Sequence, residues 1–381
     1  MNMNRQIIDE FSFTRNLSDA TTRLYASAIK SYCNFNDMNL DELIMEAEME
    51  EEDGVRWKYR KVKKRLMNYR VYLYRNYVEG TAKKYFQLIK TVYNHFDIEL
   101  QKLPHISDKN VLKNEPIQFD DLPDRELIEK ILNIANMRCR AMIFFMVSSG
   151  CARMETSNIT IDNYVEATRG YHDEDNIYDV LDVLKNRDDV VPTFKVWRKK
   201  TSKFYITFCT PEAVNSINNY LLSYRKKLNG SDRLFHATPR YINFAFASLN
   251  NKLGLGRVGS FNRFRPHMLR KFNASSLHND GLGIEYIDSL QGRVKDSVHR
   301  SYFMDSPEKL KELYMEHMGS VCIEWNVKSL SFKSKDYLDL EREVYEKSVA
   351  LNDVVNRLDE VESFIYKGLS KSDLDEMRKY V

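Results

Sequence analysis

The chain has 381 residues with a net charge of +3, and 43% of its residues are hydrophobic, 12% aromatic, 13 Gly and 8 Pro. This composition excludes a disordered or collagen-like chain, and the length predicts two domains with appended segments. No run reaches the roughly 18 apolar residues of a membrane helix and the polar start does not resemble a signal peptide, so we expect a soluble, cytoplasmic protein without a membrane partner. The five scattered cysteines predict neither disulfides nor a structural metal.

Residues 1–102 have the pattern of an all-helical domain. Apolar residues recur at three- and four-residue spacing, which predicts a small bundle of amphipathic helices. Ser18 or Asp19 is suited to cap one helix, and Gly80 with Thr81 is expected to end another helix and begin the next.

A basic stretch lies within this domain at residues 56–75. It contains nine basic residues, no acid and five aromatic residues. One interpretation is a solvated helix whose charges balance the acidic run EAEMEEED that precedes it. The length of the stretch favours the other interpretation, a helix that faces DNA phosphates. The candidate DNA contacts are Lys61, Lys63, Lys64 and Arg65.

The periodicity disappears over residues 103–123, where three prolines predict an interdomain linker. The second domain, residues 124–318, begins with helical patterns that give way near Ile159 to short alternating runs. A period-two pattern on both sides of the turn KKTSK then predicts a β-hairpin, and helical patterns return after it. We therefore expect a mainly α protein with a small β-hairpin or sheet.

The tail, residues 319–381, has a separate pattern. Residues from Leu340 to Ile365 alternate spacings of four and three, which is a heptad seam. This predicts a helix that packs on its own domain or pairs as a coiled coil.

Four segments of the second domain carry candidate chemistry. Alone, each has a plain structural explanation, because an Arg after a turn often forms a salt bridge and a Tyr often packs in the interior. Their order and spacing together form a signature of five residues that chance agreement does not explain: Arg153, Lys200, His267, Arg270 and Tyr302. The segments are SSGCARMETSNIT with Arg153, the hairpin turn with Lys200, RPHMLRKF with His267 and Arg270, and LQGRVKDSVHRSYF with Arg293 and Tyr302.

This set resembles the tyrosine recombinase (phage integrase) family, and the amino-acid sequences of these segments are similar to those of its archaeal branch. The segment SDATTRLYASAIKSYCNF also resembles that branch's core-binding domain, so the resemblance covers roughly residues 10–315. It implies an all-helical, SAM-like core-binding domain followed by a mixed α/β catalytic domain that breaks and rejoins DNA.

The resemblance also implies a role for each residue of the signature. Tyr302 is the nucleophile, and Arg153 and Arg270 bind the scissile phosphate. Lys200 protonates the leaving oxygen, and His267 assists as acid, base or phosphate ligand. It further implies that the segment after the nucleophile, SPEKLKELYMEHM, docks on a neighbouring subunit.

Arg293 departs from the family pattern, which usually has His or Trp at this position. Its guanidinium and apolar stem are able to bind phosphate and to pack, and we favour that role. The alternative is a surface arginine that pairs with Asp296 or Asp288.

The residue types also fit phosphoryl chemistry without the family name. Two guanidinium groups neutralise the charge that builds on the nonbridging oxygens, so no metal or other cofactor is required. A tyrosine hydroxyl, with an ordinary pKa of ~10, needs cations or a base nearby to act as a nucleophile. A lysine supplies the proton that an alkoxide leaving group requires.

We therefore expect a site-specific DNA recombinase that forms a 3′-phosphotyrosyl intermediate without metal or ATP. It would integrate or excise a virus, plasmid or other mobile element, acting as a dimer to tetramer on attachment sites in double-stranded DNA. The alternatives are a non-catalytic DNA-binding or bridging protein on the same scaffold and, less favoured, a metal-dependent nuclease that uses the acidic run or the residues around Asp173.

Overall fold

The computed structural model describes residues 3–107, 112–113, 117–185, 187–293 and 306–324. Tyr302 and the heptad segment from Leu340 to Ile365 lie outside the described residues. The chain divides into two compact units, residues 1–117 with 258–261, and residues 118–257 with 262–381. No helix among the described residues is long and apolar enough to cross a membrane.

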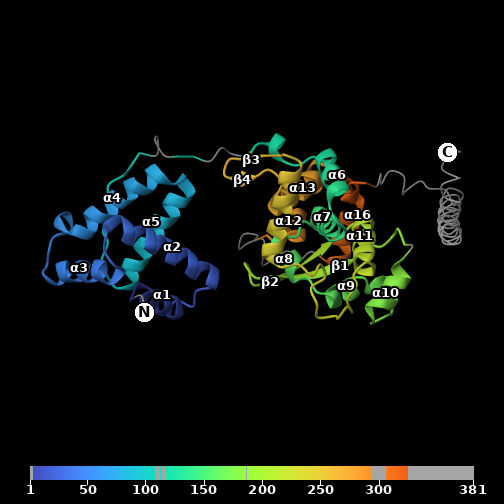
Figure 1. Ribbon diagram of the computed structural model, residues 1–381, viewed down its shortest axis with the longest axis horizontal. Coiled ribbons are helices and arrows are strands. Elements are labelled where there is room, and N and C mark those ends of the chain that lie inside the picture. The colour runs from blue at the N-terminus through green and yellow to red at the C-terminus, as the bar shows by residue number, and fades with distance from the viewer. Residues whose placement is uncertain (1–2, 108–111, 114–116, 186, 294–305, 325–381) are drawn as a thin grey trace, which may run out of the picture. The chain divides into compact units, whose positions relative to one another are not determined.

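The described residues of the first unit up to residue 117 form five helices and one short 3-10 turn at Trp57–Tyr59 (Figure 1). Ser18 caps the second helix, because its side chain accepts a hydrogen bond from the Thr21 amide. The prediction for Gly80 and Thr81 is wrong, since both lie inside the last helix, which begins at Glu79. The helices are α1 (Met3–Thr14), α2 (Asp19–Asn36), α3 (Leu40–Glu52), α4 (Lys61–Asn76) and α5 (Glu79–His95).

Buried tyrosines hold this bundle together. Tyr32 on α2, Tyr69 on α4 and Tyr93 on α5 are almost fully buried. The Tyr32 ring meets the Tyr69 ring edge-on at 4.8 Å between centroids, and the hydroxyls of Tyr32 and Tyr93 are 3.1 Å apart. Burial raises the pKa of Tyr93, so its hydroxyl stays neutral and serves as a hydrogen-bonding group in the core.

The second unit is mainly helical, which confirms the predicted class. The short alternating runs after Ile159 lie in two short helices. The helices are α6 (Arg125–Ile134), α7 (Met137–Ser149), α8 (Arg153–Asn158), α9 (Ile161–Ala167), α10 (Ile177–Leu184), α11 (Pro211–Leu222), α12 (Pro239–Lys252), α13 (Pro266–Asn279), α14 (Ile284–Leu290) and α16 (Pro307–His317), with 3-10 turns at Phe119–Asp121, Arg169–Tyr171 and Met318–Ser320.

The predicted hairpin is present. Strand β1 (Thr193–Arg198) pairs antiparallel with β2 (Lys203–Phe208), so that Arg198 faces Lys203 beside the turn. A second, shorter hairpin, which the sequence patterns did not predict, joins β3 (Arg257–Val258) to β4 (Phe261–Asn262).

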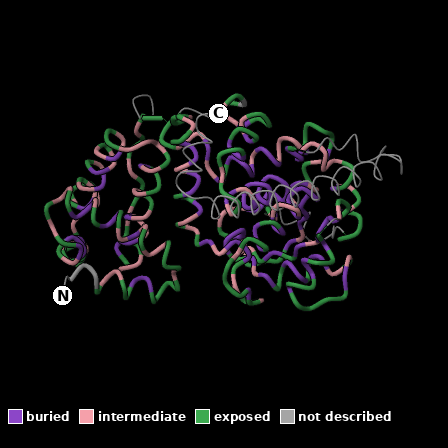
Figure 2. The backbone as a smooth tube through the Cα atoms, turned by 45° about the vertical axis from the view of Figure 1, so that its right-hand side comes forward, coloured by how far each residue is buried: buried purple, intermediate pink, exposed green. Residues whose placement is uncertain are grey.

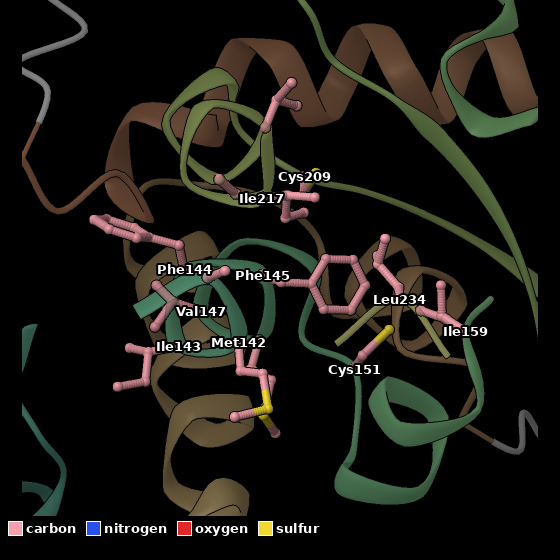
Figure 3. Close-up of a cluster of buried hydrophobic side chains, with 14 of the residues drawn as sticks. Met142, Ile143, Phe144, Phe145, Val147, Cys151, Ile159, Cys209, Ile217 and Leu234 are labelled. Atoms are coloured by element: carbon pink, nitrogen blue, oxygen red, sulfur yellow. The ribbon is translucent and has the colours of Figure 1, made fainter. Parts of the chain in front are cut away.

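Helix α7 is the core of the second unit (Figures 1 and 2). Residues 141–149 are all buried, and the helix packs between α11 and α13. Residues 141–147 are apolar on every side of the helix because no face of this stretch meets water, whereas Met137 at the start of α7 is exposed. Figure 3 shows Phe144, Phe145 and Val147 projecting from α7 into the surrounding apolar cluster.

Helix α16 packs on its own unit. Tyr314 is buried, and its hydroxyl donates to the Ser148 carbonyl of α7 at 3.1 Å. The chain that follows is held by Glu212 of α11, whose carboxylate accepts from the amides of Ile323 at 2.7 Å and Glu324 at 3.0 Å. The apolar face of α16 is therefore occupied within the same chain in this structure.

Candidate active site

The candidate site is built around the carboxylate of Glu155. Helix α7 ends at Gly150 in the left-handed conformation, at φ 65°, and the chain turns at once into α8. The Glu155 side chain accepts from the Ala152 amide at 2.6 Å, which caps the start of α8 and turns the carboxylate inward. Glu155 is only 6% exposed, so its charge requires partners from other segments.

Three other elements supply those partners. The Tyr205 hydroxyl on β2 donates to Glu155 at 3.2 Å. Arg270 on α13 donates to the same carboxylate at 3.4 Å, and Nε of Arg198 on β1 lies 3.3 Å from its other oxygen. Two guanidinium groups therefore share one buried carboxylate, which leaves the cluster with a net positive charge.

The two arginines also bind the turn that follows α14. Nη1 of Arg198 donates to the carbonyls of Gln291 and Gly292, both at 2.7 Å, and Arg270 donates to the Gln291 carbonyl and, at 2.7 Å, to that of Gly150. The Gln291 side chain donates in return to the Arg270 carbonyl at 3.1 Å. Hydrogen bonds thus join all four segments singled out in the sequence.

Gly292 is required where this turn meets the hairpin. Its φ is 57°, a conformation that side chains disfavour, and a Cβ there would lie 2.5 Å from Cδ1 of Tyr205. The close approach lets β2 lie directly against the turn that leads into Arg293.

His267 lies at the start of α13, one turn before Arg270. Although the residue is open to solvent, partial desolvation of the ring lowers its pKa, and the charges of Lys271, Arg265, Arg270 and Arg293 lower that pKa further. The neutral imidazole therefore predominates at pH 7, surrounded by cations. Such a group is able to accept a proton or to bind an anion.

Arg153 and Lys200 differ from Arg270 in having free charges. Arg153 is half-buried and Lys200 is exposed in the hairpin turn, and neither side chain has a hydrogen bond or ion pair with any described residue. Arg293 instead pairs with Asp288, at 3.1 Å between Nη1 and Oδ1, with its side chain 41% exposed. This contact is the alternative considered for Arg293 in the sequence. Tyr302 lies outside the described residues, so the structure gives no position for it.

The basic helix α4 is partly neutralised by the acidic run on α3. Arg65 donates through two nitrogens to Glu46, at 2.6 and 3.1 Å, and Lys61 reaches the same carboxylate at 3.2 Å. The hydrogen bond from Arg65 lowers the pKa of Glu46. Lys63 and Lys64 have no such partner among the described residues, so only these two of the four candidates present free charges.

Arg198, Tyr205 and Gln291 are members of the cluster that the sequence analysis missed. A signal was present for Arg198, because period two places it on the same face of β1 as buried Phe194 and Val196. A cation on an inward face requires a buried partner, and that partner is Glu155.

The described part of the chain contains no group of three His, Cys, Asp or Glu residues that could hold a metal ion. All five cysteines are buried and unpaired, and burial raises the pKa of Cys151, beside Tyr205, to about 11. A thiol with such a pKa is a poor nucleophile at neutral pH.

No protein-family model and no curated protein sequence matches the chain. Among solved structures it is similar to the XerH site-specific recombinase bound to difH substrate in a pre-cleavage complex, with 14% identity over 81% of this chain and 83% of that chain and a TM-score of 0.48. It is also similar to XerA recombinase, with 16% identity, coverage of 83% and 98% and a TM-score of 0.32. A lambda integrase dimer bound to a COC′ core site has 12% identity, coverage of 80% and 98% and a TM-score of 0.41. At these identities the side chains of the site carry the functional inference.

Proposed function

We propose that the chain is a tyrosine-type site-specific DNA recombinase that cleaves and rejoins duplex DNA through a 3′-phosphotyrosyl bond to Tyr302. The observation that supports this most strongly is the meeting of four distant segments around Glu155 and Gln291. These segments are the same four whose residues resemble the family. They bring more positive charges than the single buried carboxylate of Glu155 neutralises.

The free cations fit the charge that develops on a phosphodiester. Arg153 has no described partner to give up, so it is available to bind a nonbridging oxygen. Arg270 uses three of its five N–H donors internally, to Gly150, Glu155 and Gln291, which fixes its plane and leaves two donors for the phosphate. Preorganised donors of this kind stabilise the transition state without reorganising during the reaction.

The covalent step is balanced by the residues proposed for it. The Tyr302 oxygen bonds to phosphorus as the bond from phosphorus to the 5′ oxygen breaks. Neutral His267 accepts the tyrosine proton, and the Lys200 ammonium gives a proton to the departing 5′ oxygen. Attack by a second strand's hydroxyl reverses these transfers, so rejoining needs neither metal nor ATP.

The domain and partner assignments belong to the same proposal. Residues 1–102 bind DNA, with Lys63 and Lys64 as the phosphate contacts, residues 103–123 link the domains, residues 124–318 carry the chemistry and residues 319–381 form a C-terminal tail. Recombination exchanges strands between two sites, so the working assembly on attachment sites of a mobile element is a dimer to tetramer of this chain.

The test is covalent trapping on DNA. A library of nicked duplexes with randomised sequence is incubated with the protein, and DNA that stays attached after denaturation is sequenced. The unmodified protein is expected to give an adduct that resists chelators, and Tyr302→Phe none. Tyr286→Phe is the matched control and should trap DNA normally; Tyr314 is no competitor, because it is buried. DNA binding without any adduct would support the non-catalytic alternative.

A second comparison separates chemistry from folding. Arg153→Ala should abolish the adduct while leaving stability unchanged, since this guanidinium holds nothing in place among the described residues. Arg270→Ala should lose both adduct and stability because it removes the buried partner of the Glu155 carboxylate. Equal losses of stability in the two variants would contradict these roles.

A further inference from the structure

Arg198 occupies the end of β1, immediately before the turn that contains Lys200. Its side chain is 16% exposed, and it contacts two separate structures at once. Nη1 donates to the carbonyls of Gln291 and Gly292 at 2.7 Å, while Nε lies 3.3 Å from Glu155. No other residue of the described hairpin bonds to the turn after α14.

The two faces of this hairpin end differ in burial. On its outer face Trp197 and Phe204 are 47% and 59% exposed, and their rings pack against each other at 4.8 Å. On the inner face, Tyr205 lies against Gly292 and donates to Glu155. Arg198 and Tyr205 are therefore the two side chains that hold the free end of the hairpin, one from each strand.

We propose that Arg198 is a positioning residue that fixes the Lys200 turn relative to the turn at Gln291 and Gly292. The inference rests on the proposed function, in which Lys200 is the proton donor. Lys200 is two residues beyond Arg198 and has no described partner of its own, so its placement depends on the strand end that carries it. The same guanidinium contacts the turn that leads to Arg293, and thus sets the spacing between the proton donor and the phosphate-binding side.

The planar fork of arginine suits this task. One guanidinium donates to two carbonyls in fixed directions while its Nε lies beside a carboxylate, whereas a lysine ammonium is a point charge on a flexible stem. Arg198→Lys keeps the charge beside Glu155 but loses the simultaneous contacts. Because a misplacement of about 1 Å can cost about 100-fold in rate, the variant should slow the proton transfer without removing any reacting group.

The experiment compares two nicked substrates that differ in one atom. In the first substrate the 5′ oxygen is the leaving atom and needs a proton; in the second, sulfur replaces it. A thiol has an ordinary pKa of ~8.5, so a thiolate leaves without a proton donor. Both carry the sequence recovered by covalent trapping. We expect Arg198→Lys to slow adduct formation about 10- to 100-fold on the oxygen substrate and less than about threefold on the sulfur substrate.

Two further variants calibrate the comparison. Lys200→Ala should show the same selective rescue by sulfur, because it removes the donor itself. Arg187→Lys, which alters a surface pair with Asp189 in the same unit, should match the unmodified protein on both substrates. The ratio of the rates on the two substrates does not depend on the fraction of folded protein. Arg198→Gln is a second variant in case Arg198→Lys destabilises the unit.

The outcomes separate this inference from the proposed function. If Arg198→Lys and Arg198→Gln keep the unmodified ratio of rates on the two substrates, the inference is overturned while the recombinase function stands. This holds whether the two rates are unchanged or are slowed equally, because an equal slowing places the effect on the fold or the nucleophile. Absence of adduct from the unmodified protein on both substrates overturns the proposed function and the inference together.

Discussion

Replacement of Glu155 is expected to destabilise the second unit strongly. The carboxylate accepts from the Ala152 amide and the Tyr205 hydroxyl and balances Arg198 and Arg270, in a position where it is 6% exposed. Glu155→Ala would leave two guanidinium groups without an acid, one of them on a residue that is only 5% exposed. Removing one partner of a buried ion pair costs about 3–5 kcal/mol.

Glu155→Gln separates the charge from the shape. The amide oxygen still accepts from the Ala152 amide, so the start of α8 is kept, but the two arginines lose their counter-charge. We expect a loss of about 2 kcal/mol for this variant, within the range for a hydrogen bond to a charged group. Glu126→Ala is the control: its pair with Lys130 is exposed on both sides, and an exposed pair contributes little to stability.

Hydrogen exchange of the buried α7 amides is the suitable assay, because it reports the opening of this unit alone. Since each 1.4 kcal/mol is a factor of ten, a loss of 4 kcal/mol should accelerate the slowest α7 amides by about 1,000-fold for Glu155→Ala. The glutamine variant should show an intermediate acceleration. Exchange in Glu155→Ala that stays within tenfold of the unmodified protein would refute the role of this carboxylate as the shared partner of the arginines.

Three further predictions concern other sites. Gly292→Ala should cost about 2–4 kcal/mol in unfolding free energy, because it adds a clash with β2 to the cost of a positive φ, whereas Gly254→Ala, at φ 61° in open space, should cost only about 1–2 kcal/mol. Lys64→Ala should lower the salt slope of DNA binding by about 0.9 without changing stability, whereas Arg65→Ala should destabilise the first unit. Because the pKa of Glu46 is lowered in the fold, the ionised carboxylate stabilises the protein above pH 4.5, the ordinary pKa of the group, and this stabilisation should be lost as the pH falls through the lowered pKa. A Glu46→Gln protein whose acid unfolding curve is unchanged would contradict this.

Local patterns in the sequence predicted the elements better than the ion pairs. The hairpin followed from period two around KKTSK, and Ser18 correctly marked the start of α2, because these signals depend on neighbours in the chain. The acidic run was considered in the sequence as the counter-charge of the basic stretch, although the particular pair of Arg65 with Glu46, 19 residues away, was not. The partner of Arg270 is 115 residues away, and no local pattern reveals that pair. The sequence therefore indicated which cations are present, and only the fold indicates which of them are already neutralised.

Arg293 differs from Arg270 in how easily it changes partner. Releasing Arg270 from its internal contacts would strand a buried carboxylate, which is costly. Arg293 holds Asp288 at a surface where both side chains keep water, so giving up that pair costs at most about 1 kcal/mol. A phosphate group nearby would outweigh so weak a contact, because the arginine fork binds two phosphate oxygens at once, whereas Asp288 accepts at 3.1 Å through one oxygen only. The pair with Asp288 is therefore compatible with the phosphate-binding role that we favour for Arg293, which in the proposed recombinase would exchange Asp288 for a phosphate when DNA binds.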